Sequence, residues 1–218
     1  MAAVKKLALA GESESDKLLA QDPLALLIGM VLDQQIPLEW AFKGPKMLTE
    51  RLGSKLDATA LAEMDPETLA KAFSERPALH RYPGSMAKRV QELCRHIVDH
   101  YSGRPADVWK KAQTGDQLFR NVRGLPGFGD QKARIFIGLL GKQLGVQPPG
   151  WQDAAADFGK PGTYLSVADI VDPDSLARVR AYKQEKKAIA KMGAAGAAAK
   201  ATDAPAPSVK KAKAKPKS

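Results

Sequence analysis

Residues 125–133 read LPGFGDQKA and connect two segments in which apolar residues recur at helical spacing. Two glycines one residue apart allow a tight backbone turn, because glycine has no Cβ to clash. The helix predicted over about residues 131–144 would point its first amides at whatever binds the turn, and helix N-termini favour anions. One interpretation of residues 118–144 is therefore a helical hairpin that binds phosphate. The other is a simple turn between helices with a glycine stop.

The rest of the sequence predicts helices and no strand. Asp-Pro pairs at residues 22–23, 65–66 and 172–173 precede apolar residues at helical spacing, and Asp followed by Pro is a helix-start signal. Ser85 is expected to cap a further helix over residues 86–101. No segment alternates apolar and polar residues as a half-buried strand would. We predict an all-α fold.

Positive charge is concentrated towards the C-terminal end of the 218-residue chain. The net charge is +10, and ten lysines against two acidic residues give residues 183–218 a charge of +8, which leaves +2 for residues 1–182. We predict a folded helical domain over residues 1–182, and a basic helical extension with a disordered Lys/Ala/Pro tail over residues 183–218. The lysines of such a tail would attract DNA through counterion release, or would act only to keep the protein in solution.

Cysteine usage and apolar run length exclude several classes of protein. Cys94 is the only cysteine, which excludes an intramolecular disulfide, an iron–sulfur cluster held by several thiolates and a CxxC zinc site. The most apolar run covers only residues 24–32, whereas a membrane-spanning helix needs about 20 residues. His80, His96 and His100 have no third ligand at metal-binding spacing. We expect a cytoplasmic, nucleoid-associated protein that does not bind a membrane.

Several stretches, in order along the chain, resemble the HhH-GPD superfamily of DNA repair glycosylases, which includes endonuclease III-like and alkyladenine enzymes. They are LLIGMVLDQQI (26–36), RYPGSMAKRVQELCRHI (81–97) and QLFRNVRGLPGFG (117–129), followed by the alanine of L-P-G-F-G-x-x-x-A. The resemblance covers roughly residues 22–144. It implies a two-lobed all-α fold with a helix-hairpin-helix motif, and a double-stranded DNA partner whose damaged base is extruded into a cleft between the lobes.

The resemblance also implies roles for individual residues. The hairpin would bind phosphates, and its carbonyls would suit a Na⁺ or K⁺ ion. Phe128 is expected to point inward because of its place between the two glycines. Gln34 and Gln35 would probe the flipped base or the opposite strand; alternatively, their amides cap the end of a helix. Trp151, Trp40 and Tyr82 are predicted to line the base pocket, with core packing as the alternative. The predicted DNA-contacting residues are Leu125, Gly127, Phe128, Gly129, Gln131, Lys132, Gln34, Gln35, Lys88 and Arg89.

The chain departs from the family pattern at both catalytic positions. The nucleophilic lysine of family members with lyase activity falls at Gln131 here, and Lys132 lies about 100° further round the helix, so we interpret Lys132 as a phosphate contact. The family's catalytic aspartate falls at Pro149. Asp153, or else Asp157, is predicted to supply the carboxylate that stabilises the charged sugar or activates water, unless it is a solvated loop residue.

These observations predict a monomeric base-excision repair protein. It would be a monofunctional DNA N-glycosylase that hydrolyses the N-glycosidic bond of a damaged base without a lysine adduct. A DNA-binding or lesion-sensing protein on the same scaffold, without glycosylase activity, is the first alternative. A helical adaptor whose tail binds RNA or protein is the second.

Overall fold

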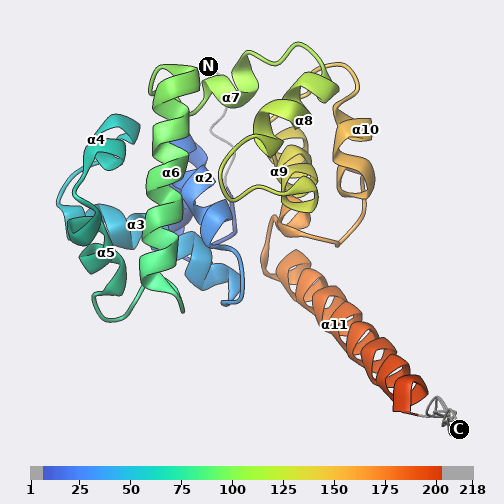
Figure 1. The fold of residues 1–218 in the computed structure, drawn as a ribbon. Helices are drawn as coiled ribbons and strands as arrows, with labels where there is room; N and C mark the ends of the chain where they lie inside the picture. Colours follow the sequence, from blue (N-terminus) through green and yellow to red (C-terminus); the bar gives the residue numbers. More distant parts are fainter. Residues whose placement is uncertain (1–6, 203–218) are drawn as a thin grey trace, which may run out of the picture. The chain divides into compact units, whose positions relative to one another are not determined.

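The computed structural model describes the backbone of residues 7–202 and the side chains of residues 7–189. The chain divides into two compact units, Met1–Arg180 and Ala181–Ser218. Every regular element in the described residues is helical, which confirms the predicted all-α class (Figure 1). The residues of the predicted disordered tail beyond residue 202 lie outside the described range.

The helices of the first unit fall into two groups of mutually contacting elements. The first group consists of α1 (Ser13–Gln21), α2 (Pro23–Leu32), α3 (Leu38–Leu52), α4 (Ala58–Glu63), α5 (Pro66–Ser74) and α6 (Pro83–Tyr101). The second consists of α7 (Asp107–Lys110), α8 (Gly115–Arg123), α9 (Asp130–Gln143), α10 (Trp151–Ala155) and the 3₁₀ turns η1 (Ala156–Gly159) and η2 (Val167–Asp169). Figure 1 shows α4 and α5 on one side of α6, and α8, α9 and α10 together on the other.

The last helix, α11 (Pro173–Thr202), begins in the first unit and continues into the second. In the second unit its side chains from Lys183 to Ile189 are exposed, and Lys186 Nζ lies 5.4 Å from the centroid of the Tyr182 ring. This part of the helix presents lysines to solvent, in keeping with the charge distribution of the sequence.

The predicted Asp-Pro helix starts are present. Asp22 Oδ1 accepts from the amides of Leu24 and Ala25, Asp65 Oδ2 accepts from Thr68 N and Asp172 Oδ1 accepts from Ser175 N. The prediction for Ser85 was wrong, because α6 begins at Pro83 and its N-cap residue is Tyr82. A proline at the first helical position needs no amide partner and has a fixed φ that suits the helix, so the helix starts there.

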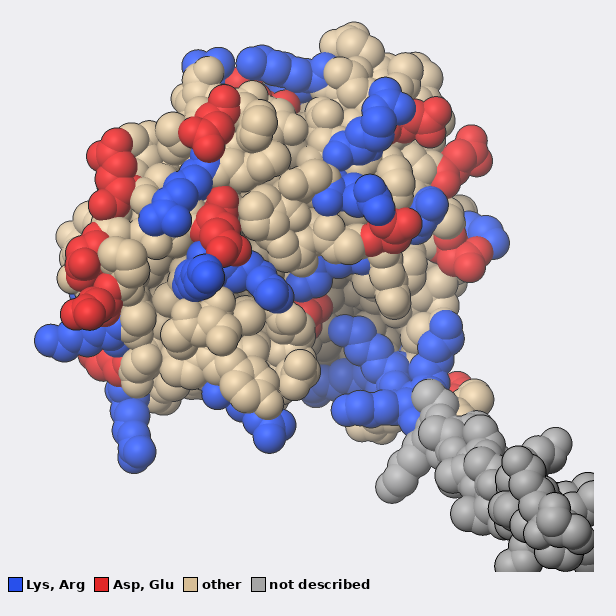
Figure 2. Space-filling model, viewed as in Figure 1, with Lys and Arg blue, Asp and Glu red and all other residues tan. Residues whose placement is uncertain are grey.

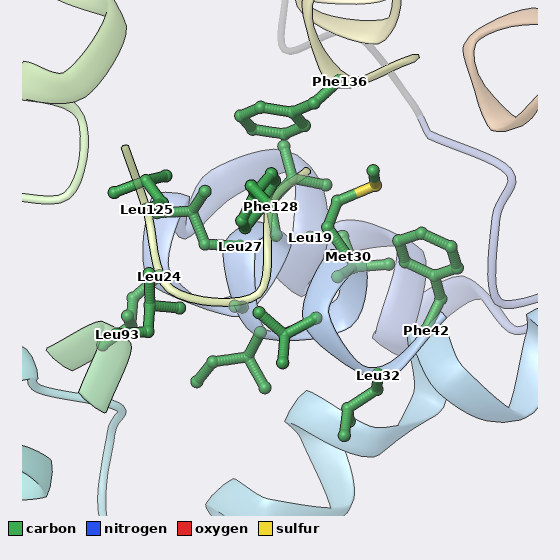
Figure 3. Packing of buried hydrophobic residues seen from close by; sticks show 14 of the residues in the cluster. Leu19, Leu24, Leu27, Met30, Leu32, Phe42, Leu93, Leu125, Phe128 and Phe136 are labelled. Carbon is green, nitrogen blue, oxygen red and sulfur yellow. The ribbon is translucent and has the colours of Figure 1, made fainter. Parts of the chain in front are cut away.

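The core lies around α2, in which every residue from Leu24 to Leu32 is buried. The hairpin packs directly onto this helix: Leu125 and Phe128 are buried, and Figure 3 shows both next to Leu27 of α2. The Phe128 ring meets Phe136 of α9 edge to face, with the ring centroids 5.7 Å apart. These contacts confirm that Phe128 points inward. They also exclude the side chains of Leu125 and Phe128 as DNA contacts, so that only the backbone is available there.

Candidate nucleic-acid interface

The two hairpin glycines are required for different reasons. Gly127 has φ +89°, and a Cβ there would lie 3.1 Å from Cδ of Arg89 and 3.3 Å from Cγ2 of Val31. Conformation and packing therefore both require glycine at position 127. Gly129 has an ordinary φ of −88°, and a Cβ there would meet no atom within 4 Å. The absence of a side chain at position 129 thus leaves the backbone open on its outer side.

The open backbone at Gly129 is the N-terminal end of α9. Gly129 is the N-cap residue and has no side chain to cap the first turn, and the Asp130 carboxylate bonds to its own backbone amide. Such amides attract an anion, because they have no partner within the helix and lie at the positive end of its dipole. Asp130, in the same turn, is paired with Arg123, and this guanidinium lowers the pKa of the Asp130 carboxyl. The pairing offsets the one negative charge next to these amides.

Lys132 lies in a different place from the one predicted. Its Nζ donates to the carbonyl oxygens of Met30, at 2.6 Å, and Val31, at 3.4 Å, which belong to the last turn of α2. Burial lowers the pKa of Lys132 to about 8; Asp33 opposes this shift and Arg89 adds to it. The structure therefore replaces the predicted phosphate contact with a hydrogen-bonded cap on α2, since a positive group is favourable at a helix C-terminus.

The lowered pKa of Lys132 makes the stability of the protein depend on pH. In the unfolded chain a lysine titrates near about 10.4, so between about pH 8 and pH 10 the unfolded state binds more protons than the folded state. The free energy of unfolding should then rise with pH in this window, by at most about 1.4 kcal/mol per pH unit from this group. Urea unfolding from pH 7 to 10 should show the rise in the wild type and not in Lys132→Met. If the free energy of unfolding changed with pH in the same way in both proteins, Nζ of Lys132 would be well solvated and its pKa would not be lowered.

The loop that follows α2 connects the hairpin to a cavity. The side-chain amide of Gln34 donates to Val31 O at 2.8 Å, which is the capping role, while His80 Nε2 lies 2.8 Å from Gln34 O. Tyr82 N donates to the other ring nitrogen of His80, so Nε2 carries the hydrogen and donates to Gln34. Gln35 is exposed and has φ +56°, a strained conformation for a residue with a side chain. Such strain in an exposed loop is typical of functional sites.

The cavity beside this loop has a volume of about 780 Å³. Ile36, Trp40 and Leu176 provide apolar walls, and His80 and Glu39 are among its polar residues. Trp40 is fixed by a hydrogen bond from Nε1 to Ala78 O, at 3.1 Å. A pocket with an aromatic wall and a few polar groups is the kind of site that takes a planar organic ring.

The three predicted pocket residues do not come together in this cavity. Of the three, Trp40 lines it. Tyr82 is 45% exposed, on the surface at the start of α6, with the Arg81 guanidinium 5.5 Å from its ring centroid. Trp151 lies against α9, where a Cβ on Gly141 would be 2.2 Å from Cζ3 of the indole. Trp151 therefore follows the core-packing alternative.

Asp153 and Asp157 are exposed and lie by another hollow, of about 440 Å³, that they share with Lys160. Asp157 pairs with Lys160 at 2.6 Å. The structure does not bring either aspartate to the cavity of Trp40. The acidic residue that does line the cavity is Glu39, which sequence reasoning missed. The sequence feature that could have indicated Glu39 is its position in the first turn of the helix that directly follows Gln34 and Gln35.

Exposed basic side chains of the hairpin include Arg120 and Arg123, in the last turn of α8. Lys88 is exposed on α6, and Arg89 is partly buried against Gly127. On the face shown in Figure 2, Lys and Arg side chains are interspersed with Asp and Glu over the upper part, and gather in a patch at the lower right. Arg123, which pairs with Asp130, thus places an exposed basic side chain beside the first turn of α9.

Within the residues that the structure describes, no group of three or more His, Cys, Asp or Glu side chains could hold a metal ion. His96 and His100 pack against each other on α6, with ring centroids 4.3 Å apart. No helix in this part of the chain is both long and apolar enough to cross a membrane. The alkali cation at the hairpin carbonyls stays a prediction.

The buried α2 and the hairpin with its open amide end define a helix-hairpin-helix protein. Residues 28–195 match the family of HhH-GPD superfamily base excision DNA repair proteins. The match covers well over half of the 218 residues, and the chain belongs to this superfamily. Searches among curated proteins and among solved structures found no match. Membership connects the chain to base excision repair and to DNA, and the superfamily consists largely of DNA glycosylases.

Proposed function

We propose that this protein is a monofunctional DNA N-glycosylase, which binds double-stranded DNA as a monomer and hydrolyses the bond between a damaged base and its sugar. The observation that carries the proposal is the connection between the open end of α9 and the cavity. Lys132 of α9 donates to Val31 O, Gln34 donates to the same oxygen, and His80 of the cavity wall bonds to Gln34 O. A phosphate on the hairpin and an extruded base in the cavity would thus be held by one connected structure.

The hairpin amides would position the sugar–phosphate chain. Gly129 leaves the first turn of α9 open, Gln131 is exposed in that turn, and Lys88 is exposed on α6. Amide contacts to phosphate carry no sequence information, which suits an enzyme that must find a lesion in any sequence. Gln35 and Tyr82, both exposed near the end of α2 and the start of α6, are the side chains that would enter the duplex around the extruded nucleotide.

The residues at positions 131 and 132, where a nucleophilic lysine could stand, both support hydrolysis without a lysine adduct. Gln131 stands at the position of the lyase lysine, and an amide cannot form a Schiff base with a sugar aldehyde. Lys132 is bonded to the carbonyls at the end of α2. The attacking group would therefore be water, and the product an intact strand with an abasic site.

Base release from defined duplexes tests the proposal. Wild-type protein is incubated with duplexes that carry one alkylated, oxidised, deaminated or crosslinked base, and free base is measured together with abasic sites. We expect release from at least one class, strand cleavage only after alkali, and no protein–DNA adduct after borohydride reduction. Pro149 at the family's acid position favours a lesion-sensing protein as the second candidate. Selective binding of a damaged duplex with no release of base from any of them would establish that function and contradict ours.

A further inference from the structure

We propose that Glu39 is the catalytic carboxylate of this protein, in place of the acid that the family pattern puts at Pro149. This inference rests on the proposed glycosylase function. It concerns a residue of the first helix group, far in the sequence from the positions that counting from the hairpin would reach, none of which lines the cavity.

Glu39 lies where the nucleotide would be held. It is in the first turn of α3, which begins at Leu38, directly after the loop with Gln34 and Gln35. Its side chain lines the cavity next to Trp40 and is 19% exposed. A base that stacks on Trp40 would place its sugar close to Glu39, the neighbouring residue that lines the same cavity.

The Glu39 carboxylate is oriented by an ion pair. Arg180, which also lines the cavity, donates from its guanidinium to Oε1 of Glu39. Among the described residues, no hydrogen bond is formed to the other oxygen, Oε2. One oxygen thus fixes the side chain, and the second is available to a water molecule or to the sugar, which is the arrangement that carboxylate assistance needs.

The other acidic residues near the hairpin are less suited to this role. Asp130 is bonded to Arg123 and exposed at the start of α9. Asp33 lies near the buried ammonium of Lys132 and does not line the cavity. Asp153 lies at the separate hollow beside α10. Of these acids Glu39 alone shares a cavity with an aromatic wall.

The proposed reaction is a hydrolysis that needs only water. The C1′–N bond breaks and its electron pair leaves with the base, while positive charge develops on the sugar ring facing the carboxylate. A water oxygen then bonds to C1′ and gives one proton to Glu39. That proton passes to the departing base, directly or through solvent, which returns Glu39 to its carboxylate form.

Variants of each candidate acid test the assignment on the duplex that the wild type processes best. Single-turnover base release should fall about 100-fold or more in Glu39→Gln, the effect typical of losing a general base. Asp153→Asn and Asp33→Asn, as matched controls, should stay within about threefold of the wild type. Affinity for an undamaged duplex should be the same in all four proteins, which shows that the glutamine variant is folded.

A second readout separates catalysis from packing. A duplex with a cationic pyrrolidine in place of the sugar mimics the charged transition state, and the wild type should bind it more tightly than a duplex with neutral tetrahydrofuran. Glu39→Gln should lose this preference. Base release by Glu39→Gln at the wild-type rate, or a loss confined to Asp153→Asn, would overturn the assignment while leaving the glycosylase function intact. A wild type that releases no base from any duplex would overturn both.

Discussion

Replacing Gly129 with valine should weaken the binding of duplex DNA about tenfold or more and leave the protein folded. The φ of −88° suits valine and no atom lies within 4 Å of the position of its Cβ, so the free energy of unfolding should fall by at most about 1 kcal/mol, from the poorer N-cap. The added isopropyl group would cover the first amides of α9. A tenfold loss corresponds to about 1.4 kcal/mol, close to one hydrogen bond to a charged phosphate.

Two further variants control this experiment. Ala60→Val adds similar bulk at an exposed position on α4, and should change neither affinity nor stability appreciably. Gly127→Ala should lower stability by about 1–3 kcal/mol instead, because φ is +89° and the methyl group would press on Arg89 and Val31. Fluorescence anisotropy with a labelled duplex at fixed salt gives the affinities. Equal affinity of Gly129→Val and the wild type would show that phosphate does not bind at these amides.

Removal of the Asp169 carboxylate should lower the free energy of unfolding by about 3–5 kcal/mol. The side chain is 3% exposed and accepts from Lys142 Nζ at 2.6 Å, Leu165 N at 2.8 Å and Ser166 N at 3.1 Å. In Asp169→Ala the mostly buried ammonium of Lys142 would lose its counter-charge and keep only Thr163 Oγ1, at 3.2 Å, and two amides would lose their acceptor. Since Lys142 is in the last turn of α9, this pair holds the segment before α11 against the hairpin helix.

An exposed ion pair provides the comparison for Asp169. Asp174 and Arg178 of α11 are 2.9 Å apart, with side chains 72% and 56% exposed. Asp174→Ala should cost at most about 1 kcal/mol, because solvent screens such pairs. Urea unfolding at pH 7 measures both variants. Similar small losses for the two would mean that the Asp169 pair is hydrated and does not anchor α9.

Local signals in the sequence predicted much of the fold. Asp22, Asp65 and Asp172 each act on amides two or three residues away, and such contacts depend little on the rest of the chain. The inward orientation of Phe128 followed from its place between two glycines. The prediction for Ser85 was wrong because Pro83, two residues earlier, gives a stronger start to the same helix.

The residues whose location the sequence did not predict are positioned by contacts between distant parts of the chain. Helical periodicity gives the face on which Lys132 lies, but not that the end of α2, 102 residues away at Met30, packs against this face. Counting from the hairpin gives Pro149, and Asp153 was the first acidic residue after it. The cavity is instead assembled from separate parts of the chain, which include Gly11, Trp40, His80 and Arg180. Nothing in their spacing brings these residues together, so Glu39 became a candidate only through the three-dimensional structure.

A crystal structure of the protein bound to a duplex with a single pyrrolidine abasic nucleotide tests the central claim most directly. We expect a phosphate next to that nucleotide within hydrogen-bonding distance of the amides at the start of α9, and the pyrrolidine ring extruded to the cavity of Trp40. DNA bound elsewhere, with the amides after Gly129 facing solvent and the nucleotide still stacked in the helix, would contradict the account.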